Sequence, residues 1–337
     1  MTKNTRRFVF VAAGVLVFGL GTGLVASYVG FQNIVLIGRD GPAELDYISS
    51  DVKGVAFANV REIMDSDLRK KVMQLHRGAG TDADHFQQET GINLQTDVDE
   101  VVATVSGEGT SQRPLLIVRG RFDNATLEGL ALQHGAAVEE YRGKRLAINP
   151  TADFGVAFLD PGIVGVGTPA AVRRAIDTKA DGSNIRGNAE IMRLVRDIDD
   201  GNAWTIANFD AITGGVQLPA EIASQLPPIT WFAASGYVNG GVRGMIRAEA
   251  RDEAAAQALR EVLQGFMALA RLQVGQRPEF GELLNSLQLG GQGKTVSLGF
   301  SIPSEVIDAL AAIAAPRPSA GVVVEPTLKE RRPLPAL

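Results

Sequence analysis

The most uniform apolar pattern in the chain is a run over residues 8–29, which contains no charged residue and follows three cations near the N-terminus. As a helix with a rise of about 1.5 Å per residue, this run would span about 33 Å, enough to cross a hydrocarbon core of about 30 Å. The cations lie before the run, and acidic residues dominate after Arg39. This bias predicts a cytoplasmic stub at residues 1–7 and a single-pass transmembrane anchor at residues 8–29.

A cleavable signal peptide is the main alternative to this anchor. Its apolar segment should be about 7–15 residues long and should end at a small-x-small cleavage site. The run is longer than that, and the sequence ASYVG at residues 26–30 is a poor cleavage site. The chain has no cysteine, so it cannot be a lipidated lipoprotein. We therefore favour an uncleaved anchor in a bacterial inner membrane, with a periplasmic or extracytoplasmic ectodomain.

Beyond the anchor, short strand-like runs alternate with amphipathic helices, and the same pattern occurs twice. Residues 54–63 read GVAFANVREI, and residues 203–212 read AWTIANFDAI. Three further segments recur in the same order, each a strand or a strand running into a helix: 103–107 with 232–236, 115–130 with 243–259, and 163–176 with 296–310. The preceding segments, 42–48 and 188–194, also agree loosely. Four matches in one order predict an internal duplication.

The matched segments place the same kinds of helix-start residue at equivalent positions. Asn59 and Asn208 both follow a strand and lie where a helix N-cap would, and Glu62 completes a capping box in the first copy. Pro169 and Pro303 both fall in the first turn of a helix after a strand. We predict structural roles for these four residues, Asn59, Asn208, Pro169 and Pro303.

The pattern predicts an α+β protein in which a transmembrane helix precedes two similar halves, each an antiparallel sheet with helices packed on one face. Short turns, such as the one at Arg142 and Gly143, favour antiparallel pairing of neighbouring strands. The turn-rich residues 181–184 mark the boundary between the halves. The predicted divisions are a linker at 30–42, a first repeat at 43–181, a second repeat at 182–315, and a disordered Pro-rich tail at 316–337.

One predicted helix, residues 252–271, has an extended apolar stripe. Its members recur at helical spacing: Ala255, Leu259, Val262, Phe266 and Leu269. The expected role of such a stripe is ordinary packing against a core. A face that binds lipid or a partner helix is the alternative.

Composition limits the kinds of partner. The chain is 45% hydrophobic and 21% charged, which is typical of a folded globular protein. Its net charge is −5, and no basic cluster lies near aromatic residues, so nucleic acid is not an expected partner. Without cysteine there is no disulfide framework, and a core of this size does not need one.

The candidate chemical motifs fail on spacing or on context. Residues 290–295 resemble a phosphate loop, but the required earlier glycine is Gln288, and a strand rather than a helix follows. A hairpin turn fits these glycines better. Gly165 and Gly167 imitate a dinucleotide fingerprint, yet Thr168 as a cap before Pro169 explains the local sequence. We predict no catalytic, cofactor-binding or metal-binding residue and no cofactor.

Several segments carry a resemblance to known sequences: ANVREIM, VRGRFD, VRRAID, NAWTIANFD and PITWFAASGYVNG. Together with the anchor, they resemble a group of bacterial single-pass membrane-anchored proteins with a duplicated α+β ectodomain and no established function. The resemblance implies an envelope protein. It transfers no catalytic or binding residue.

The sequence thus favours a membrane-tethered extracytoplasmic binding or scaffold protein that is not an enzyme. Its expected partners are the membrane and either another protein or a second copy of itself, since Gly19 and Gly23 have the spacing that lets membrane helices approach closely. Two alternatives remain open. One is a carrier or binder of an apolar ligand such as lipid, and the other is an envelope hydrolase.

Overall fold

A computed structural model of the protein describes residues 40–70, 87–88, 90–107, 113–198, 201–209, 227–274, 281, 284–304 and 306. The predicted anchor at residues 8–29 and the predicted tail at residues 316–337 lie outside these ranges. Within the ranges, no helix combines the length and the apolar character needed to cross a membrane.

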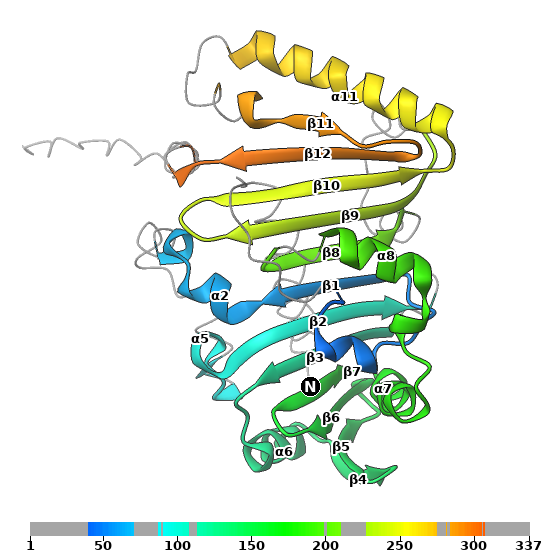
Figure 1. Cartoon of the computed structure of the whole chain (residues 1–337). Coiled ribbons are helices and arrows are strands. Elements are labelled where there is room, and N and C mark those ends of the chain that lie inside the picture. Colours follow the sequence, from blue (N-terminus) through cyan, green and yellow to red (C-terminus); the bar gives the residue numbers. More distant parts are fainter. Residues whose placement is uncertain are drawn as a thin grey trace, which may run out of the picture.

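The fold is built on one antiparallel sheet of 12 strands, in the order β11-β12-β10-β9-β8-β1-β2-β3-β7-β6-β5-β4 (Figure 1). The elements up to the predicted boundary are η3 (Ala43–Tyr47), β1 (Gly54–Asn59), α2 (Val60–Asp65), α5 (Leu94–Asp97), β2 (Val98–Ser106), β3 (Arg113–Gly120), α6 (Asn124–Gln133), β4 (Ala137–Tyr141), β5 (Lys144–Asn149), β6 (Phe154–Asp160), β7 (Ile163–Gly167) and α7 (Pro169–Asp181). Those after it are η5 (Ile185–Gly187), α8 (Ala189–Ile198), β8 (Ala203–Asn208), β9 (Ile229–Val238), β10 (Val242–Ala250), α11 (Glu253–Val274), β11 (Gln288–Gly290) and β12 (Thr295–Ile302).

The α+β class and the antiparallel pairing are confirmed, but the expectation of a separate sheet in each half is wrong. Strand β1 pairs with β8, so the strands of both halves belong to a single sheet. The reason lies in the sequences of the two strands. Both alternate apolar residues with small ones, which lets them pair at the centre of a sheet with side chains buried on one face.

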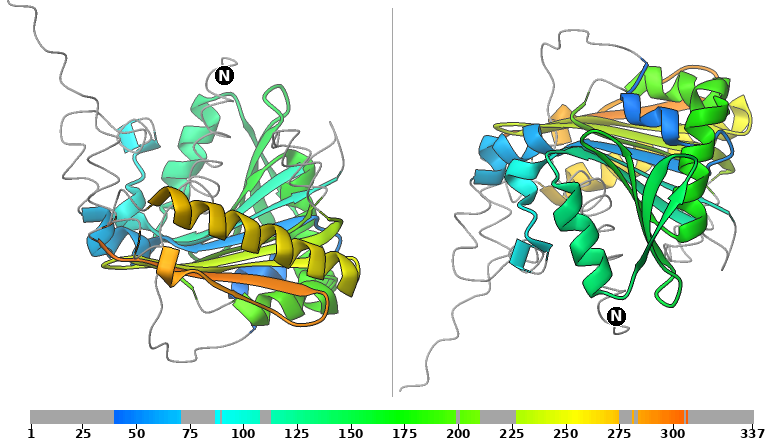
Figure 2. Two further views of the ribbon diagram at one scale, coloured as in Figure 1. Left: turned by 90° about the horizontal axis from the view of Figure 1, so that it is seen from above. Right: turned by 90° about the horizontal axis from the view of Figure 1, so that it is seen from below.

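Helices cover both faces of the sheet rather than one (Figure 2). One face, here called the core face, carries the largest apolar core, to which η3, α7, η5 and α8 contribute; its sheet residues include Val102, Ile117 and Ile206. The opposite face, here called the groove face, carries smaller clusters that involve α2, α5, α6 and α11. Strand alternation explains this, because residues two apart point to the same side and the sheet has apolar residues on both sides.

The strand order is symmetrical about the β1–β8 pair. At the centre, Ala56 pairs with Thr205, and these two residues hold the same place in the matched segments 54–63 and 203–212. Outward from this point, Gly54 pairs with Ala207, and Ala58 pairs with Ala203. Exchanging the two segments therefore reproduces the same pairing, as an approximate two-fold axis through the centre requires.

The two halves correspond more closely in the order of their strands than in the register with which neighbouring strands pair. Ala103 of β2 pairs with Ala56, whereas Phe232, its match in the sequence comparison, pairs with Ala207 rather than with Thr205. This is an offset of two residues. An even offset keeps each side chain on the same face, so the apolar pattern of both halves is compatible with it.

The largest difference between the halves lies in the strands that follow α6 and α11. Four strands, β4 to β7, separate α6 from α7. The added hairpin β4–β5 turns at Arg142 and Gly143, both of which have positive φ, as the predicted turn requires. In the second half, only β11 and β12 follow α11 in the part of the chain that the structure describes.

Candidate functional site

Helix α11 is firmly packed only in its N-terminal half. Asp252 accepts a hydrogen bond from the backbone N–H of Ala255 at 2.8 Å, which caps the helix start and holds the pKa of the Asp252 carboxyl below its ordinary value. Ala256 and Leu259 are buried against Ala248, Ala250 and Val296 of β10 and β12 on the groove face. This half of the helix therefore belongs to the core.

The C-terminal half of α11 is apolar but exposed. Phe266, Leu269 and Leu272 have exposed fractions of 46%, 57% and 80%. Residues 262–270 contain no charged side chain. The prediction that the whole stripe packs in the core thus holds for Ala255 and Leu259 and is wrong for Phe266 and Leu269. The sheet supplies too little surface there, because its edge strand β11 is three residues long, whereas α11 has 22.

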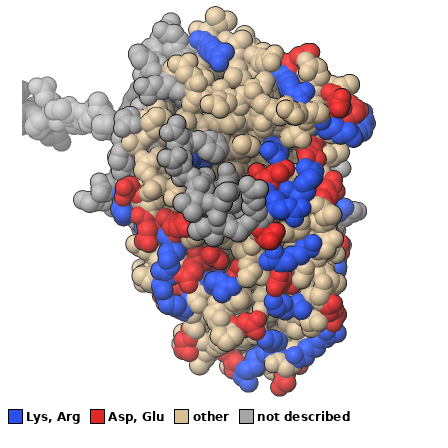
Figure 3. Space-filling model, in the orientation of Figure 1, with Lys and Arg blue, Asp and Glu red and all other residues tan. Residues whose placement is uncertain are grey.

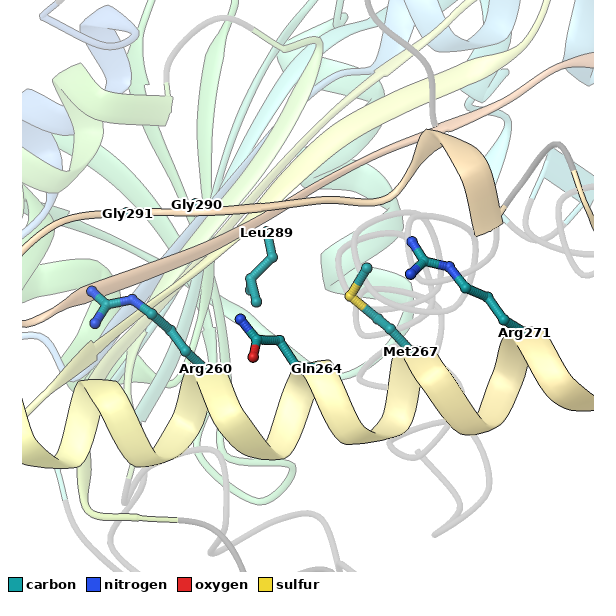
Figure 4. Close-up of a pocket in the computed structure, with 7 residues that line it drawn as sticks. All are labelled: Arg260, Gln264, Met267, Arg271, Leu289, Gly290 and Gly291. Atoms are coloured by element: carbon teal, nitrogen blue, oxygen red, sulfur yellow. The ribbon is translucent and has the colours of Figure 1, made fainter.

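A groove of about 300 Å³ lies between this half of α11 and the edge strand. From the helix it is lined by Arg260, Gln264, Met267 and Arg271, whose side chains point toward β11 (Figure 4). Their spacing of about one turn places them on one side of the helix. The opposite wall is formed by Leu289, Gly290 and Gly291.

One end of the groove is rigid because Arg260 is bound to the turn before β12. Its Nη2 atom donates hydrogen bonds to the carbonyl oxygens of Gly293 at 3.1 Å and Thr295 at 2.9 Å. Gly291 has a φ of +96°, and a Cβ there would lie 2.3 Å from the carbonyl oxygen of Thr295. The residues that resembled a phosphate loop therefore form the predicted hairpin turn, and glycine is needed at 291 for that turn to close.

The middle of the groove mixes polar and apolar side chains, with Gln264 and Met267 on the helix wall and Leu289 on the other, whereas exposed Arg271 lies toward its other end (Figure 4). No carboxylate occurs among the described residues that line it. The volume is at the lower end of the range of about 300–1,000 Å³ for small-molecule sites. An apolar chain with an anionic group suits this lining, because Met267 and Leu289 would contact the chain and a guanidinium would bind the anion.

The four cap residues predicted from the sequence lie away from this groove, at the ends of strands. Asn59 precedes α2, and its Oδ1 atom accepts a hydrogen bond from the backbone N–H of Glu62 at 3.1 Å. Asn208 ends β8, but residues 210–226, where its helix would lie, are outside the described ranges.

The two prolines have similar local positions. Pro169 is the first residue of α7, and Thr168 caps that helix by accepting a hydrogen bond from the backbone N–H of Ala171 at 3.2 Å. Pro303 follows β12, and its carbonyl oxygen accepts a hydrogen bond from the backbone N–H of Val306 at 3.2 Å. Most of the helix expected after Pro303 is outside the described ranges.

A second polar cluster lies on the core face, where η3 meets the sheet. The side chain of Glu44 is fully buried and accepts a hydrogen bond from Nε of Arg119, and Glu100 lies 3.7 Å from the same nitrogen. Burial, and then the nearby Glu44, raise the pKa of Glu100 above its ordinary value. Periodicity did not reveal Glu44, because its sequence neighbours give no sign that an acid would be buried.

The same region contains ion pairs that hold η3 against the sheet and α7. Asp46 contacts Lys179 at 2.7 Å and Arg186 at 2.6 Å. Burial acts to raise the pKa of Asp46, but hydrogen bonds and charge interactions with these two cations lower it below the ordinary value. Asp160 accepts hydrogen bonds from Lys144, at 2.8 Å, and from the hydroxyl of Tyr47, which hold its pKa below the ordinary value. The cluster thus fixes a segment in place.

No group of three or more His, Asp or Glu side chains that could hold a metal ion occurs among the residues that the structure describes. The groove beside α11 and the polar cluster at η3 are therefore the two arrangements with distinctive chemistry. Only the first combines an open cavity with side chains suited to a ligand.

Comparisons with known proteins identify no family. No protein-family model matches the chain, and no curated protein matches it in sequence. Two solved structures, crystal forms I and III of TP0453, share 10% sequence identity with it, with TM-scores of 0.43 and 0.44. The alignments cover 82% and 81% of this chain and 99% of the TP0453 chain in both cases. A likeness at this level carries no argument about function.

Proposed function

We propose that this chain is a membrane-tethered extracytoplasmic binding or scaffold protein of the bacterial envelope and that it is not an enzyme. The observation that carries the proposal is the C-terminal half of α11. It combines exposed Phe266, Leu269 and Leu272 with a groove whose described lining residues include no carboxylate. Exposed apolar side chains grouped beside a groove are typical of binding surfaces.

The tether is part of the proposal, and the sequence supports it. Residues 8–29 form an uncharged apolar run of sufficient length, and the cations before it favour a cytoplasmic N-terminus. The first described element, η3, begins at Ala43, so the predicted linker at residues 30–42 would separate membrane and ectodomain by 13 residues. Such a linker reaches at most about 47 Å when extended.

Duplication of an ancestral unit is also part of the proposal. It is supported by the four matched segments, by the symmetrical strand order and by the pairing of Ala56 with Thr205. In this interpretation, two copies of a strand and helix unit joined edge to edge at β1 and β8. The copies then diverged at their outer ends, where α11 and its groove lie.

The absence of cysteine makes the tether and its orientation directly testable. In Ala125→Cys, the new thiol replaces an exposed residue of α6, and in Thr2→Cys it lies in the predicted cytoplasmic stub. We expect an impermeant maleimide to label Ala125→Cys in intact spheroplasts and Thr2→Cys only after lysis, with the full chain retained in membranes after carbonate washing. Reversed labelling, or release by carbonate, would contradict the proposal.

A second candidate function, binding of an apolar ligand with an anionic group, is favoured by the lining of the groove. Its middle is formed by Gln264, Met267 and Leu289, and Arg271 lies near one end. The ligand class is that of fatty acids and phospholipids, which share an acyl chain and a negative charge. Such a ligand would lie along α11 with its chain between helix and strand.

Native mass spectrometry of the full-length protein, released from detergent micelles, tests this binding. We expect an anionic amphiphile to accompany the wild type and to be lost in Met267→Trp, because the larger side chain fills the middle of the groove. Ala268→Trp is the matched control, since Ala268 is exposed on the same helix and does not line the groove. A wild type without ligand, or equal occupancy in both variants, would refute this second function.

A further inference from the structure

The exposed apolar side chains of α11 form a strip on the side of the helix that faces away from the groove. At 3.6 residues per turn, Phe266, Leu269 and Leu272 lie within about 120° of arc, centred roughly opposite the groove-lining residues. Their exposed fractions rise along the helix from 46% to 80%. The strip is therefore a separate surface from the groove, and the described residues do not bury it.

The charge distribution distinguishes this end of the molecule from the rest. Residues 262–270 carry no charge, and the charged residues that flank them are Arg260, Glu261 and Arg271. In the space-filling view, uncharged residues cover much of the end formed by α11 and β12, whereas Lys, Arg, Asp and Glu lie toward the right-hand end of that helix and over the opposite end of the molecule (Figure 3).

We infer that this strip, defined by Phe266, Leu269 and Leu272, docks on the surface of the lipid bilayer to which the chain is tethered. The inference rests on the proposed function for the tether, which keeps the ectodomain beside the membrane. A helix that binds at a membrane interface presents Phe and Leu to the acyl region and holds Arg at the headgroup level. The strip supplies the first group. Arg271 lies on the opposite, polar side of the helix, from which its long side chain can extend toward the headgroups.

The geometry gives this contact a consequence for the groove. Because the strip and the groove lie on opposite sides of the same helix, docking would leave the groove accessible beside the membrane surface. An acyl chain that left the bilayer could then enter it between α11 and β11. The bilayer contact and the ligand site would therefore operate together, although each can be tested alone.

The test uses the full-length chain reconstituted into vesicles of neutral phosphatidylcholine. The cysteine-free background allows one label per molecule, so Leu269→Cys and Leu272→Cys would each carry an environment-sensitive fluorophore. Matched positions are Gln257→Cys, exposed on the N-terminal half of the same helix, and Leu132→Cys, an exposed leucine of α6. Vesicles with and without a nitroxide quencher on the acyl chain report contact with lipid.

We expect quenching at residues 269 and 272 to exceed that at residues 257 and 132 by about twofold or more, as for an interfacial helix. Equal quenching at all four positions would overturn the inference. A fluorescence change at residue 269 that depends on protein concentration but not on the quencher would instead indicate contact with a second copy of the chain. A change that depends on neither would indicate contact with another segment of the same chain. Either result refutes bilayer docking.

Adding Leu272→Glu to the labelled Leu269→Cys chain provides an independent readout. The second substitution should lower quenching at residue 269 toward the control level, because a carboxylate disfavours entry into the interface. Thermal unfolding should be unchanged, since Leu272 is 80% exposed and makes little contribution to the core. If the chain stays in the membrane after carbonate washing but residue 269 remains unquenched, the inference fails while the proposed tether stands.

Discussion

The two halves of the sheet differ most at their outer ends, although they begin from the same kind of unit. In the first half, α6 has ten residues and is followed by the hairpin β4–β5, which extends the sheet. In the second half, the corresponding helix α11 has 22 residues, and the sheet ends at the short strand β11. The same strand-to-helix unit thus ends in an extended sheet on one side and an apolar groove on the other.

The two helices also differ in how their apolar surfaces are used. Leu127 of α6 packs against Phe158 and Val164 on the groove face, so part of the apolar surface of that helix is used within the fold, whereas Leu132 near its end is 48% exposed. The corresponding surface of α11 is buried as far as Leu259, Leu263 packs partly against the same cluster, and Phe266, Leu269 and Leu272 beyond it are exposed. In the proposed function, these exposed side chains are the part of the helix available for binding.

The largest predicted effect tests whether the halves form one cooperative structure. Trp204 of β8 is 3% exposed and packs against Phe57 of β1, with ring centroids 5.6 Å apart. Trp204→Ala should lower the free energy of unfolding by about 3–5 kcal/mol, because it opens a large cavity at the junction. Circular dichroism during chemical denaturation should show a single transition for both proteins.

Two separate transitions in the wild type would contradict the single cooperative structure, since the halves would then unfold independently. Ile206→Val serves as the matched control at the same junction. It removes one methyl group from a fully buried side chain and should cost about 0.5–1.5 kcal/mol.

A smaller change in stability is expected from a pair of substitutions that compares the segments preceding β1 and β8. Glu44 and Glu190 occupy matched positions in residues 42–48 and 188–194, yet the Glu44 side chain is fully buried and Glu190 is exposed. Glu44→Gln should lower stability by about 1–3 kcal/mol, because Arg119 loses a charged hydrogen-bond partner. Glu190→Gln should change it by less than about 0.5 kcal/mol.

Equal losses from the two substitutions would contradict this asymmetry. Nuclear magnetic resonance titration of Glu100 gives a second measure. Its pKa is raised by burial and then by the adjacent Glu44, so removing the charge at position 44 should lower that pKa. A pKa that does not move would show that Glu44 does not act on Glu100.

The smallest predicted effect concerns pH and the hairpin that only the first half has. Lys144 of β5 and Tyr47 lower the pKa of Asp160, so the folded state binds fewer protons than the unfolded state near that pKa. The resulting stabilisation is present above the ordinary Asp pKa of about 3.8 and is lost as the pH falls through the lowered value. Asp160→Asn should therefore flatten the stability profile below about pH 4.

The change should be at most about 1 kcal/mol, because the Asp160 side chain is 41% exposed and solvent screens the pair. Denaturation midpoints measured between pH 2 and pH 6 would reveal it, with Glu190→Gln as an exposed control. A profile identical to that of the wild type would show that this pair does not contribute.

Local features were predictable because each depends on a few neighbouring residues. The strands around the Asn59 and Asn208 positions, the hairpin at Arg142 and Gly143, and the start of α7 at Pro169 were all evident from turn chemistry and alternation. The stripe in α11 was also evident. Its partial exposure was not, because periodicity shows which residues share a side of a helix but not what covers that side.

The sequence by itself determined the alternation of strands and helices, the recurrence of that pattern in two halves, and the absence of a recognisable catalytic motif. Tertiary structure decided that β1 pairs with β8 to make one sheet, that Glu44 is buried, and that β11 ends beneath half of α11. The physical reason is the range of the interactions. Turns and caps involve residues a few positions apart, whereas the pairing of β1 with β8, the burial of Glu44 against Arg119 and the position of β11 beneath α11 depend on residues that lie tens to about 150 positions apart in the chain.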